Sequence, residues 1–521
     1  MARPARPPWR SVRHRRRPGS ESGRRCCSGS RRRGAGRRSR PAPFERGARV
    51  SARVASYRPG CISSVWLVAR TVREPAREVD VVRETDVLVV GSGPAGLAAA
   101  LAAARAGAEV SLVERFGCFG GNITAVGVEG MAWYRREQTV EANGLGREFE
   151  VRAREFGVAV PETQSDSYEI DAEGFKFVAD RLVEEAGVCP MLHRLVVAPV
   201  MDGDVVRGVI TESKAGREAV LARRVIDATG DADIAHRAGA ATHVTPREDM
   251  LAASVMFHLS GVDKVAFLAG VRDDPQTYAD WSAGDWEIET DGKEDALFSP
   301  YLRKPFQSAM RDGVIPANLT TLGGTWGAVH DTGELTYMNV VHLPGVDGTD
   351  ADDLTRGEMD GRRQAMHAIA ALRRYTRGCE QVRLRNFGMT IGIRDTRKID
   401  AAYNLTEDDV RGQARFDDSI GIYPEFIDGY GVLVIPTTGR YYHVPYRCML
   451  PRGVRNLLVP GRPSGGDRIA HASTRNMSCC AVQGQGAGIA AAVSLHTDTD
   501  LADVDISAVQ RELARQGVRY E

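Results

Sequence analysis

The chain of 521 residues has few cysteines and no long apolar run. Its nine cysteines show no CxxC spacing, which argues against a zinc site, an iron–sulfur site and a dithiol relay, and they are too few for a disulfide framework. No segment approaches the roughly 18 uninterrupted apolar residues that a membrane-spanning helix needs. We therefore expect a cytoplasmic protein that holds no metal and does not span a membrane.

Lysine and aspartate are absent from the first 50 residues, which contain 17 arginines and two glutamates, a net charge of 17 − 2 = +15. Such a segment cannot bury a core, so we expect residues 1–71 to be disordered. It could be a nucleic-acid arm or a targeting or export segment, but translated GC-rich non-coding DNA has the same composition. We interpret it as a misassigned start, with Val68 or Val72 as the initiator. The remaining residues carry 1 − 15 = −14, which argues against general nucleic-acid binding.

The most informative segment is residues 84–115, ETDVLVVGSGPAGLAAALAAARAGAEVSLVER. Residues 86–90 form an apolar run typical of a buried strand, and a helix-forming stretch rich in Ala and Leu follows the Gly-rich turn. A second strand then ends at the acidic residue Glu114. This order of strand, turn, helix, strand and acid predicts a dinucleotide-binding βαβ unit, whereas the glycines alone would also fit an ordinary strand-to-helix turn.

Each glycine of the GxGxxG pattern has its own expected role. Gly91 permits the tight turn, Gly93 lets the backbone approach a pyrophosphate, and Gly96 lets helix and strand pack closely. Glu114 lies 23 positions after Gly91, close to the roughly 20-residue separation at which an acid accepts hydrogen bonds from a ribose.

The residues that follow Glu114 bring a resemblance to a known class. The sequence RFGCFGGNIT, with Gly120 and Gly121 as a second glycine pair, resembles flavoproteins of the glutathione reductase and fumarate reductase structural class. In that class the second pair lies against the flavin, where a backbone without side chains suits a planar ring. The resemblance therefore implies FAD as the cofactor.

Two distant segments extend the resemblance. Asp171 is expected to cap a helix at 172–186, and three alternating strands follow, LVVAPV, DVVRGVIT and AVLARRVIDA. The last runs into the Ala-Thr-Gly-Asp turn at 228–231, similar to the turn where such flavoproteins return to the cofactor. Residues 445–495 resemble the C-terminal block of the family of FAD-dependent oxidoreductases.

In that C-terminal block, the resemblance places Gly461 and Arg462 beside the ribityl chain and makes QGQGAG, with Gly484 and Gly486, a helix start whose dipole points at the flavin. Tight helix packing is the alternative explanation for QGQGAG. The expected cofactor-binding residues are Gly91, Gly93, Pro94, Ala95, Gly96, Glu114, Arg115, Gly120, Gly121, Asn122, Val196, Thr229, Gly230, Asp231, Gly461, Arg462, Gly484 and Gly486.

The predicted fold is α/β: a Rossmann-like FAD-binding domain, with a parallel sheet and a β-meander, plus an inserted α+β substrate or cap domain. The FAD-binding domain is expected to be discontinuous, from 84–245 and 441–500, with the substrate domain at 246–440 and a helical tail at 501–521. Acidic loops such as 350–353 and a helix at about 356–377 belong to the substrate domain. The substrate should bind where the two domains meet.

Candidates for substrate binding and proton transfer lie near this junction. By analogy with fumarate-reductase-like enzymes, Arg394 and Arg397 would hold an acidic group, and His443 or His471 would act as acid or base. Each has an ordinary alternative: an arginine that ties loop carbonyls, or a histidine satisfied at an interface.

The chain has no second GxGxxG followed by an acid, so electrons should enter or leave through the substrate. The resemblance implies hydride transfer between the flavin N5 and a small organic molecule, with an anionic molecule as one candidate. Two alternatives stay open: an RNA-associated or RNA-modifying flavoprotein, and a flavin-binding protein without turnover. The substrate and the oligomeric state cannot be derived from the sequence.

Overall fold

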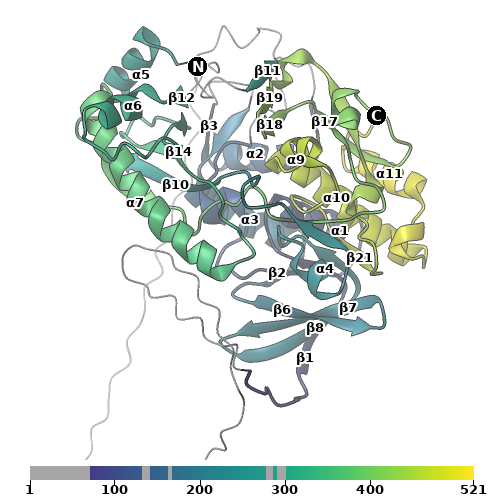
Figure 1. Ribbon diagram of the computed structural model, residues 1–521. Coiled ribbons are helices and arrows are strands. Elements are labelled where there is room, and N and C mark those ends of the chain that lie inside the picture. Colours follow the sequence, from purple (N-terminus) through teal and green to yellow (C-terminus); the bar gives the residue numbers. More distant parts are fainter. Residues whose placement is uncertain (1–70, 132–140, 162–166, 277–285, 290–300) are drawn as a thin grey trace, which may run out of the picture. The chain divides into compact units, whose positions relative to one another are not determined.

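The computed structural model describes residues 71–131, 141–161, 167–276, 286–289 and 301–521. Residues 77–521 form one compact unit, which Figure 1 shows. The expectations for residues 1–71 lie, apart from Thr71, outside the described residues. Within the described part of the chain, we find no helix that combines the length and the apolar character needed to cross a bilayer.

A seven-stranded sheet is the centre of the unit and has the predicted Rossmann-like character. Its order is β5-β2-β1-β8-β7-β6, and β21 also pairs with β8. Strands β5, β2, β1 and β8 run parallel, as does β21, whereas β8, β7 and β6 form the predicted antiparallel meander. The strands are β1 (Asp80–Val90), β2 (Val110–Val113), β5 (Cys189–Met191), β6 (Leu195–Asp202), β7 (Val205–Ser213), β8 (Gly216–Asp227) and β21 (Leu457–Leu458).

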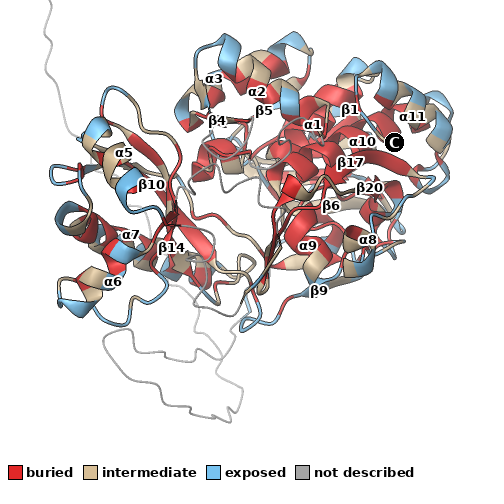
Figure 2. Ribbon diagram, turned by 90° about the horizontal axis from the view of Figure 1, so that it is seen from above, coloured by how far each residue is buried: buried red, intermediate tan, exposed pale blue. Residues whose placement is uncertain are grey.

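Two buried helices cover this sheet and pack directly on each other: α1 (Pro94–Arg105) and α10 (Met477–His496). Both are apolar on nearly all sides, which is typical of a helix inside a core. Glycines bring their backbones together, because a Cβ on Gly484 or Gly488 would lie only 2.0 or 2.2 Å from a carbonyl oxygen of α1. Figure 2 shows the two helices almost wholly buried.

A second sheet has its own buried apolar cluster. It has five strands in the order β12-β13-β14-β10-β15, all pairs antiparallel, and α7 lies along it (Figure 1). These elements are β10 (Ala253–Ser260), β12 (Tyr301–Leu302), β13 (Gly324–Thr325), β14 (Leu335–Leu343), β15 (Arg383–Phe387) and α7 (Ala351–Tyr375). The division of the chain into an FAD-binding and a substrate domain stays a prediction.

Two element boundaries differ from the sequence-based expectation. Helix α7 begins five residues early because the side chain of Asp350 accepts hydrogen bonds from the backbone N–H groups of Asp352 and Asp353. Residues 350–353 are therefore a helix cap and a first turn, not an acidic loop. Strand β1 begins at Asp80 instead of Asp86 because its exposed first half pairs with β8. The helix capped by Asp171 is confirmed.

The remaining elements connect and flank the two sheets. The helices are α2 (Leu145–Glu155), α3 (Ala172–Glu185), α4 (Asp233–Arg237), α5 (Lys264–Asp273), α6 (Lys304–Arg311), α8 (Glu407–Arg411), α9 (Arg468–Thr474) and α11 (Ile506–Arg515), with a π-helical turn η1 (Asn122–Val126) and the 3-10 turns η4 (Pro436–Thr438), η5 (Tyr446–Met449) and η6 (Leu501–Asp503). The short strands are β3 (Ala159–Pro161), β4 (Tyr168–Ile170), β9 (Thr242–Val244), β11 (Glu287–Glu289), β16 (Arg397–Ile399), β17 (Ser419–Pro424), β18 (Ile427–Gly429), β19 (Val432–Val434) and β20 (Tyr441–Pro445).

Candidate functional site

The Gly-rich turn between β1 and α1 leaves open space beside its backbone. Gly91 has a φ of 89°, and a Cβ on it would lie 2.4 Å from the carbonyl oxygen of Ala228, so only glycine fits there. Gly93 is the N-cap of α1, and a Cβ on it would meet no atom within 4 Å. The free N–H groups of the first helical turn therefore lie next to an open space, as an anion-binding helix start requires.

Three further glycines shape this region by close packing. A Cβ on Gly96 would lie 1.8 Å from the carbonyl oxygen of Gly91, and a Cβ on Gly121 would lie 2.5 Å from Cα of Gly93. Gly120 has a φ of 107° and packs on the side chain of Thr124. The two Gly-rich turns are thus in contact, although 27 positions separate Gly93 from Gly120 in the sequence.

A cavity of about 190 Å³ runs along these turns, and we call it the narrow groove. It brings together 14 of the 18 residues expected at the cofactor. These are Gly91, Gly93, Pro94, Ala95, Glu114, Arg115, Gly121, Asn122, Val196, Thr229, Gly230, Asp231, Gly461 and Arg462. Gly96 and Gly120 support the turns from behind the lining, and Gly484 and Gly486 lie elsewhere.

The expectation that a helix starts at Gly484 is wrong. Helix α10 begins at Met477, after its N-cap Asn476, so Gly484 and Gly486 lie in its middle. A Cβ on Gly484 would strike the carbonyl of Ala95, and one on Gly486 would strike Ile420. Both glycines therefore serve helix packing, the alternative noted for this motif, and the helix end that can face a ligand is two turns earlier.

Glu114 is held firmly at the start of the groove. One carboxylate oxygen accepts hydrogen bonds from the backbone N–H and the hydroxyl of Ser92, at 2.9 and 2.7 Å, and the other accepts from the N–H of Phe116 at 2.9 Å. The acid is 6% exposed and lines the groove. Its charge is thus fixed beside the Gly-rich turn. The bond to a ribose stays a prediction.

At the other wall, Asp231 organises a polar cluster. One of its carboxylate oxygens accepts a hydrogen bond from the hydroxyl of Thr396 and another from Nη2 of Arg462, at 2.8 Å for the arginine. Arg397 donates to the backbone carbonyl of Asp231 at 3.1 Å and to the carboxylate of Asp233 at 3.3 Å. Arg397 lines neither cavity and ties a loop carbonyl, so the structure does not support its expected role as a ligand for an acidic group.

A second and larger cavity, of about 520 Å³, adjoins the groove, and we call it the large cavity. The two share four lining residues, Asn122, Ile393, Arg475 and Met477. Because α10 begins at Met477, its positive end lies at this junction and favours negative charge there. A ligand in the large cavity can therefore lie next to a ligand in the groove.

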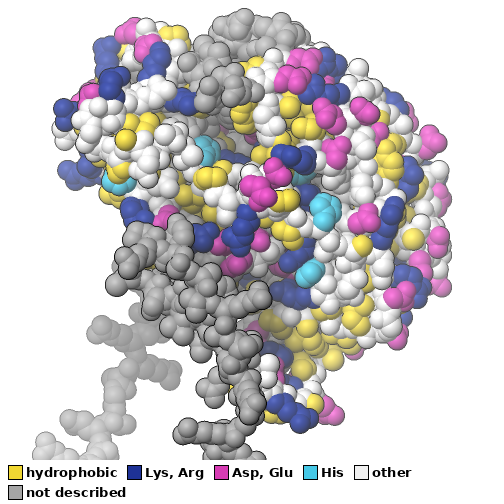
Figure 3. Space-filling view, in the orientation of Figure 1, with side chains coloured by type: hydrophobic (Ala, Val, Ile, Leu, Met, Phe, Trp, Pro, Cys, Tyr) yellow, Lys and Arg dark blue, Asp and Glu magenta, His cyan; other side chains and the backbone are white. Residues whose placement is uncertain are grey.

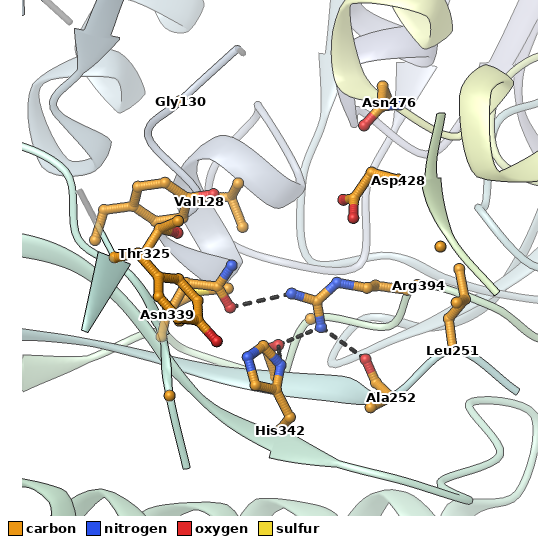
Figure 4. Close-up of a pocket in the computed structure, with 18 of the residues that line it drawn as sticks. Val128, Gly130, Leu251, Ala252, Thr325, Asn339, His342, Arg394, Asp428 and Asn476 are labelled. Carbon is orange, nitrogen blue, oxygen red and sulfur yellow. Dashed lines mark hydrogen bonds between the residues drawn. The ribbon is translucent and has the colours of Figure 1, made fainter. Parts of the chain in front are cut away.

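Arg394 is the one predicted catalytic residue that lines the large cavity. Its guanidinium donates to the carbonyl of Ala252 at 2.6 Å, to the hydroxyl of Ser254, and to the amide oxygen of Asn339 at 3.0 Å (Figure 4). All three acceptors are uncharged. Burial lowers the pKa of Arg394 to about 10, and the nearby charge of Arg475 adds to the effect, so the group is still a cation at neutral pH.

Sequence reasoning missed several polar residues of this cavity. Arg475 donates to the carbonyl and the carboxylate of Asp428, at 3.1 Å for the carboxylate, and its buried Nε has no hydrogen-bond partner among the described residues. His342 lies 3.3 Å from the hydroxyl of Ser254, and burial and the charge of Arg394 lower its pKa to about 3. Arg475 could have been predicted from the sequence, because helix α10 begins two residues after it and its positive end faces the cavity junction. No sequence pattern around Asp428 or His342 indicates a binding site.

The two histidines proposed as acid or base lie outside both cavities. The buried Nε2 of His471 lies 3.1 Å from the backbone carbonyl oxygen of Arg394, and burial and the charge of Lys398 hold its pKa well below the ordinary range. His443 is on β20, where its Nδ1 accepts from the N–H of Phe416 at 3.2 Å. One ring nitrogen of each, Nδ1 of His471 and Nε2 of His443, is buried and has no hydrogen-bond partner among the described residues. Neither histidine faces a cavity, so the expected proton-transfer role finds no support in the structure for either.

A buried charge pair lies directly behind Arg394. The fully buried carboxylate of Asp395 accepts hydrogen bonds from Lys398 Nζ at 2.6 Å, Tyr430 OH at 2.5 Å and Thr245 Oγ1 at 2.9 Å. Burial raises the pKa of Asp395, but the neighbouring positive groups and these hydrogen bonds outweigh it, and the pKa lies at about 2. This carboxylate is therefore ionised and fixes the segment that carries Arg394.

Comparison with known proteins gives a family. The model of the family described as FAD dependent oxidoreductase matches residues 86–513. A digeranylgeranylglycerophospholipid reductase from Methanoculleus marisnigri is 31% identical over 183 residues, 33% of this chain and 45% of that protein. A thiamine thiazole synthase from Metallosphaera sedula is 31% identical over 161 residues, 29% of this chain and 55% of that protein. The chain thus spans about half the length of these curated relatives.

Among solved structures, a geranylgeranyl bacteriochlorophyll reductase-like protein from Thermoplasma acidophilum matches with a TM-score of 0.42 and 14% identity, over 84% of each chain. The family match covers most of the chain, and the narrow groove fits the family's cofactor: Gly93 offers space for a pyrophosphate at a helix start, and Glu114 lies where a ribose is expected. This chain belongs to the FAD-dependent oxidoreductase family, and it is an enzyme with FAD as its cofactor.

Proposed function

We propose that this enzyme oxidises or reduces a small organic anion bound in the large cavity, by hydride transfer between the substrate and the flavin N5. One observation carries the proposal: the large cavity adjoins the narrow groove and contains the partly buried cation of Arg394, whose hydrogen bonds go to uncharged acceptors. An anionic ligand would offset the cost of keeping this charge out of water. When bound, FAD supplies the two-electron chemistry at N5.

The residues of the chain would bind and orient the substrate. The planar guanidinium of Arg394 suits a carboxylate, and the bonds to Ala252 and Asn339 hold it in place. Arg475 lines both cavities, so its positive charge lies at their junction. We assign proton transfer to none of the described residues, because the predicted histidines lie outside the cavity.

The two alternative functions have less support. A flavin-binding protein without turnover does not agree with membership of an enzyme family. An RNA-binding surface should show a continuous basic stripe, but on the face in Figure 3 the basic and acidic side chains are interspersed. The family acts on small molecules, which fits a cavity between protein elements.

The proposal predicts a selective effect of Arg394→Met. The variant should bind its acidic substrate about 10–150-fold more weakly, because a hydrogen bond to a charged group contributes about 1.5–3 kcal/mol. Flavin absorbance of the purified holoenzyme, followed anaerobically against a panel of organic acids and their reduced or oxidised partners, identifies the substrate and gives its KM. Arg394→Lys, which keeps the charge, should recover part of the affinity.

Arg363→Met on α7 is the matched control, because its side chain is 63% exposed and pairs with Asp360 on the surface. It should leave both KM and the FAD content unchanged. If Arg394→Met keeps the wild-type KM for the acid that bleaches the flavin, the proposed binding role of the large cavity is wrong.

The pH dependence of substrate binding should be flat between about pH 5 and pH 9. The pKa of His342 lies at about 3 and that of Arg394 at about 10, so neither changes charge in this range. An ordinary substrate carboxylate is ionised above about pH 5. Titration of the dissociation constant against pH tests this. A break near pH 6.5 would show that a histidine titrates at the bound substrate after all.

A further inference from the structure

We infer that the large cavity selects a monocarboxylate with an apolar body and rejects a second acidic group, and that Asp428 is the residue responsible for this rejection. The inference rests on the proposed function and names the class of its substrate. It follows from the charges that line the cavity, from the lining as a whole and from the pairing of Arg475.

The charged groups of the lining leave one positive charge. The described lining residues include three arginines, Arg303, Arg394 and Arg475, and two acids, Glu169 and Asp428. Three positive and two negative charges give a net charge of +1, and the neutral His342 adds nothing. A single carboxylate would balance this formal charge of the described residues, whereas a dicarboxylate would leave an excess negative charge.

The two buried arginines are not equivalent. Arg475 is already paired with the carboxylate of Asp428 at 3.1 Å, and its side chain is 10% exposed. Arg394 bonds only to uncharged groups among the described residues, so its charge is available to a ligand. Figure 4 shows Arg394 reaching between Asp428 on one side and Asn339 and His342 on the other.

Asp428 is therefore a barrier to a second acid. A second carboxylate that reached this side of the cavity would meet Asp428, whose pairing with Arg475 leaves that cation unavailable to it, and the two like charges would repel each other.

A large part of the remaining lining suits an apolar body, although uncharged polar side chains such as Thr320, Thr321 and Thr325 also belong to it. The apolar part includes Met256, Trp286, Leu322, Phe426, Leu433 and Ile435. A cavity of about 520 Å³ is also larger than a two- to four-carbon acid requires, since cavities of about 300–1,000 Å³ hold ligands of drug-like size. An acid with an aromatic or long aliphatic body would fill this space, with its carboxylate at Arg394.

The test compares three matched probes on the holoenzyme: 4-phenylbutyrate, its uncharged amide, and 4-(4-carboxyphenyl)butyrate, which adds a second carboxylate to the same body. Binding is measured by calorimetry at one pH and ionic strength. The wild type should bind the monocarboxylate at least about tenfold more tightly than either of the others. Asp428→Asn should reduce the difference in affinity between the monocarboxylate and the dicarboxylate. Arg394→Met should bind the monocarboxylate and its amide with similar affinity.

Tighter binding of the dicarboxylate by the wild type would overturn the inference, as would an unchanged ratio in a folded Asp428→Asn holoenzyme. So would the failure of every phenylalkanoate from phenylacetate to phenyloctanoate to bind. The wild-type ratio decides the question even if Asp428→Asn does not fold.

Turnover separates the two proposals. If the enzyme binds monocarboxylates selectively but no acid bleaches the flavin, the inference holds and the proposed function is wrong. If only a dicarboxylate bleaches the flavin, the proposed function holds and the inference is wrong.

Discussion

Gly93→Ala is expected to yield a folded protein that has lost most of its FAD. The φ and ψ of Gly93, −61° and −178°, are open to any residue, and the new Cβ would meet no atom within 4 Å. The free energy of unfolding of the apoprotein should therefore fall by no more than about 1 kcal/mol, the cost of a poorer helix cap. The methyl group would instead occupy the narrow groove, where the cofactor backbone must approach.

The expected loss follows from the cost of overpacking. Inserting a methyl group into a packed contact costs about 1–3 kcal/mol, or about 5–150-fold in the dissociation constant of FAD. The measurements are the FAD content of the purified protein and the affinity of the apoprotein for added FAD. Gly203→Asn is the control: this exposed turn glycine has a φ of 61°, which Asn tolerates, and open space around it. Full FAD content in Gly93→Ala would place the cofactor elsewhere.

The cofactor half of the site could be predicted because its determinants are local. Gly91, Gly93 and Glu114 lie within one βαβ unit, and the distances between them along the sequence are set by one strand, one turn and one helix. The parallel sheet with its meander was predictable for the same reason. The strand boundaries were less certain, since the exposed first half of β1 shows no apolar alternation and depends on pairing with β8.

The substrate half could not be predicted in the same way, because its residues come from distant elements. Asn339 and His342 lie on β14 of the five-stranded sheet, Asp428 lies on β18 of a separate three-stranded sheet, and Arg475 precedes α10. Only the folded chain brings them to one cavity. Residue type alone also misled. The free histidine side chain has a pKa suited to proton transfer, but burial lowers the pKa of both His443 and His471. A polar sequence motif gives no indication of how deeply it is buried.

The segment 394–396 connects the two cavities through three consecutive side chains. Arg394 enters the large cavity, Asp395 is buried against Lys398, and Thr396 bonds to Asp231 at the wall of the narrow groove. A rigid Asp395 therefore holds both its neighbours in register. We expect a change at Asp395 to weaken the binding of substrate and of FAD together, whereas a change at Arg394 affects the substrate alone.

Asp395→Asn should lower the free energy of unfolding by about 3–5 kcal/mol, because it leaves the buried ammonium of Lys398 without a charged partner. Lys398→Met should cost a similar amount by leaving the carboxylate unbalanced. The double variant should cost less than the sum of the two, by about 0.5–3 kcal/mol, since the residues interact directly. Urea unfolding of the holoenzyme at pH 7, with FAD content as a second measurement, gives the three values.

The pH dependence of stability provides an independent check on Asp395. Its folded pKa of about 2 lies below the ordinary value near 3.9, so it stabilises the wild type above about pH 4, and this contribution is lost as the pH falls towards 2. In Asp395→Asn, this loss of stability between about pH 4 and pH 2 should be absent. The control is Lys304→Met, which breaks an exposed pair with Asp274 and should change stability by less than about 1 kcal/mol. If Asp395→Asn behaves like this control, the charge pair does not hold the segment, and the coupling between the two cavities has another origin.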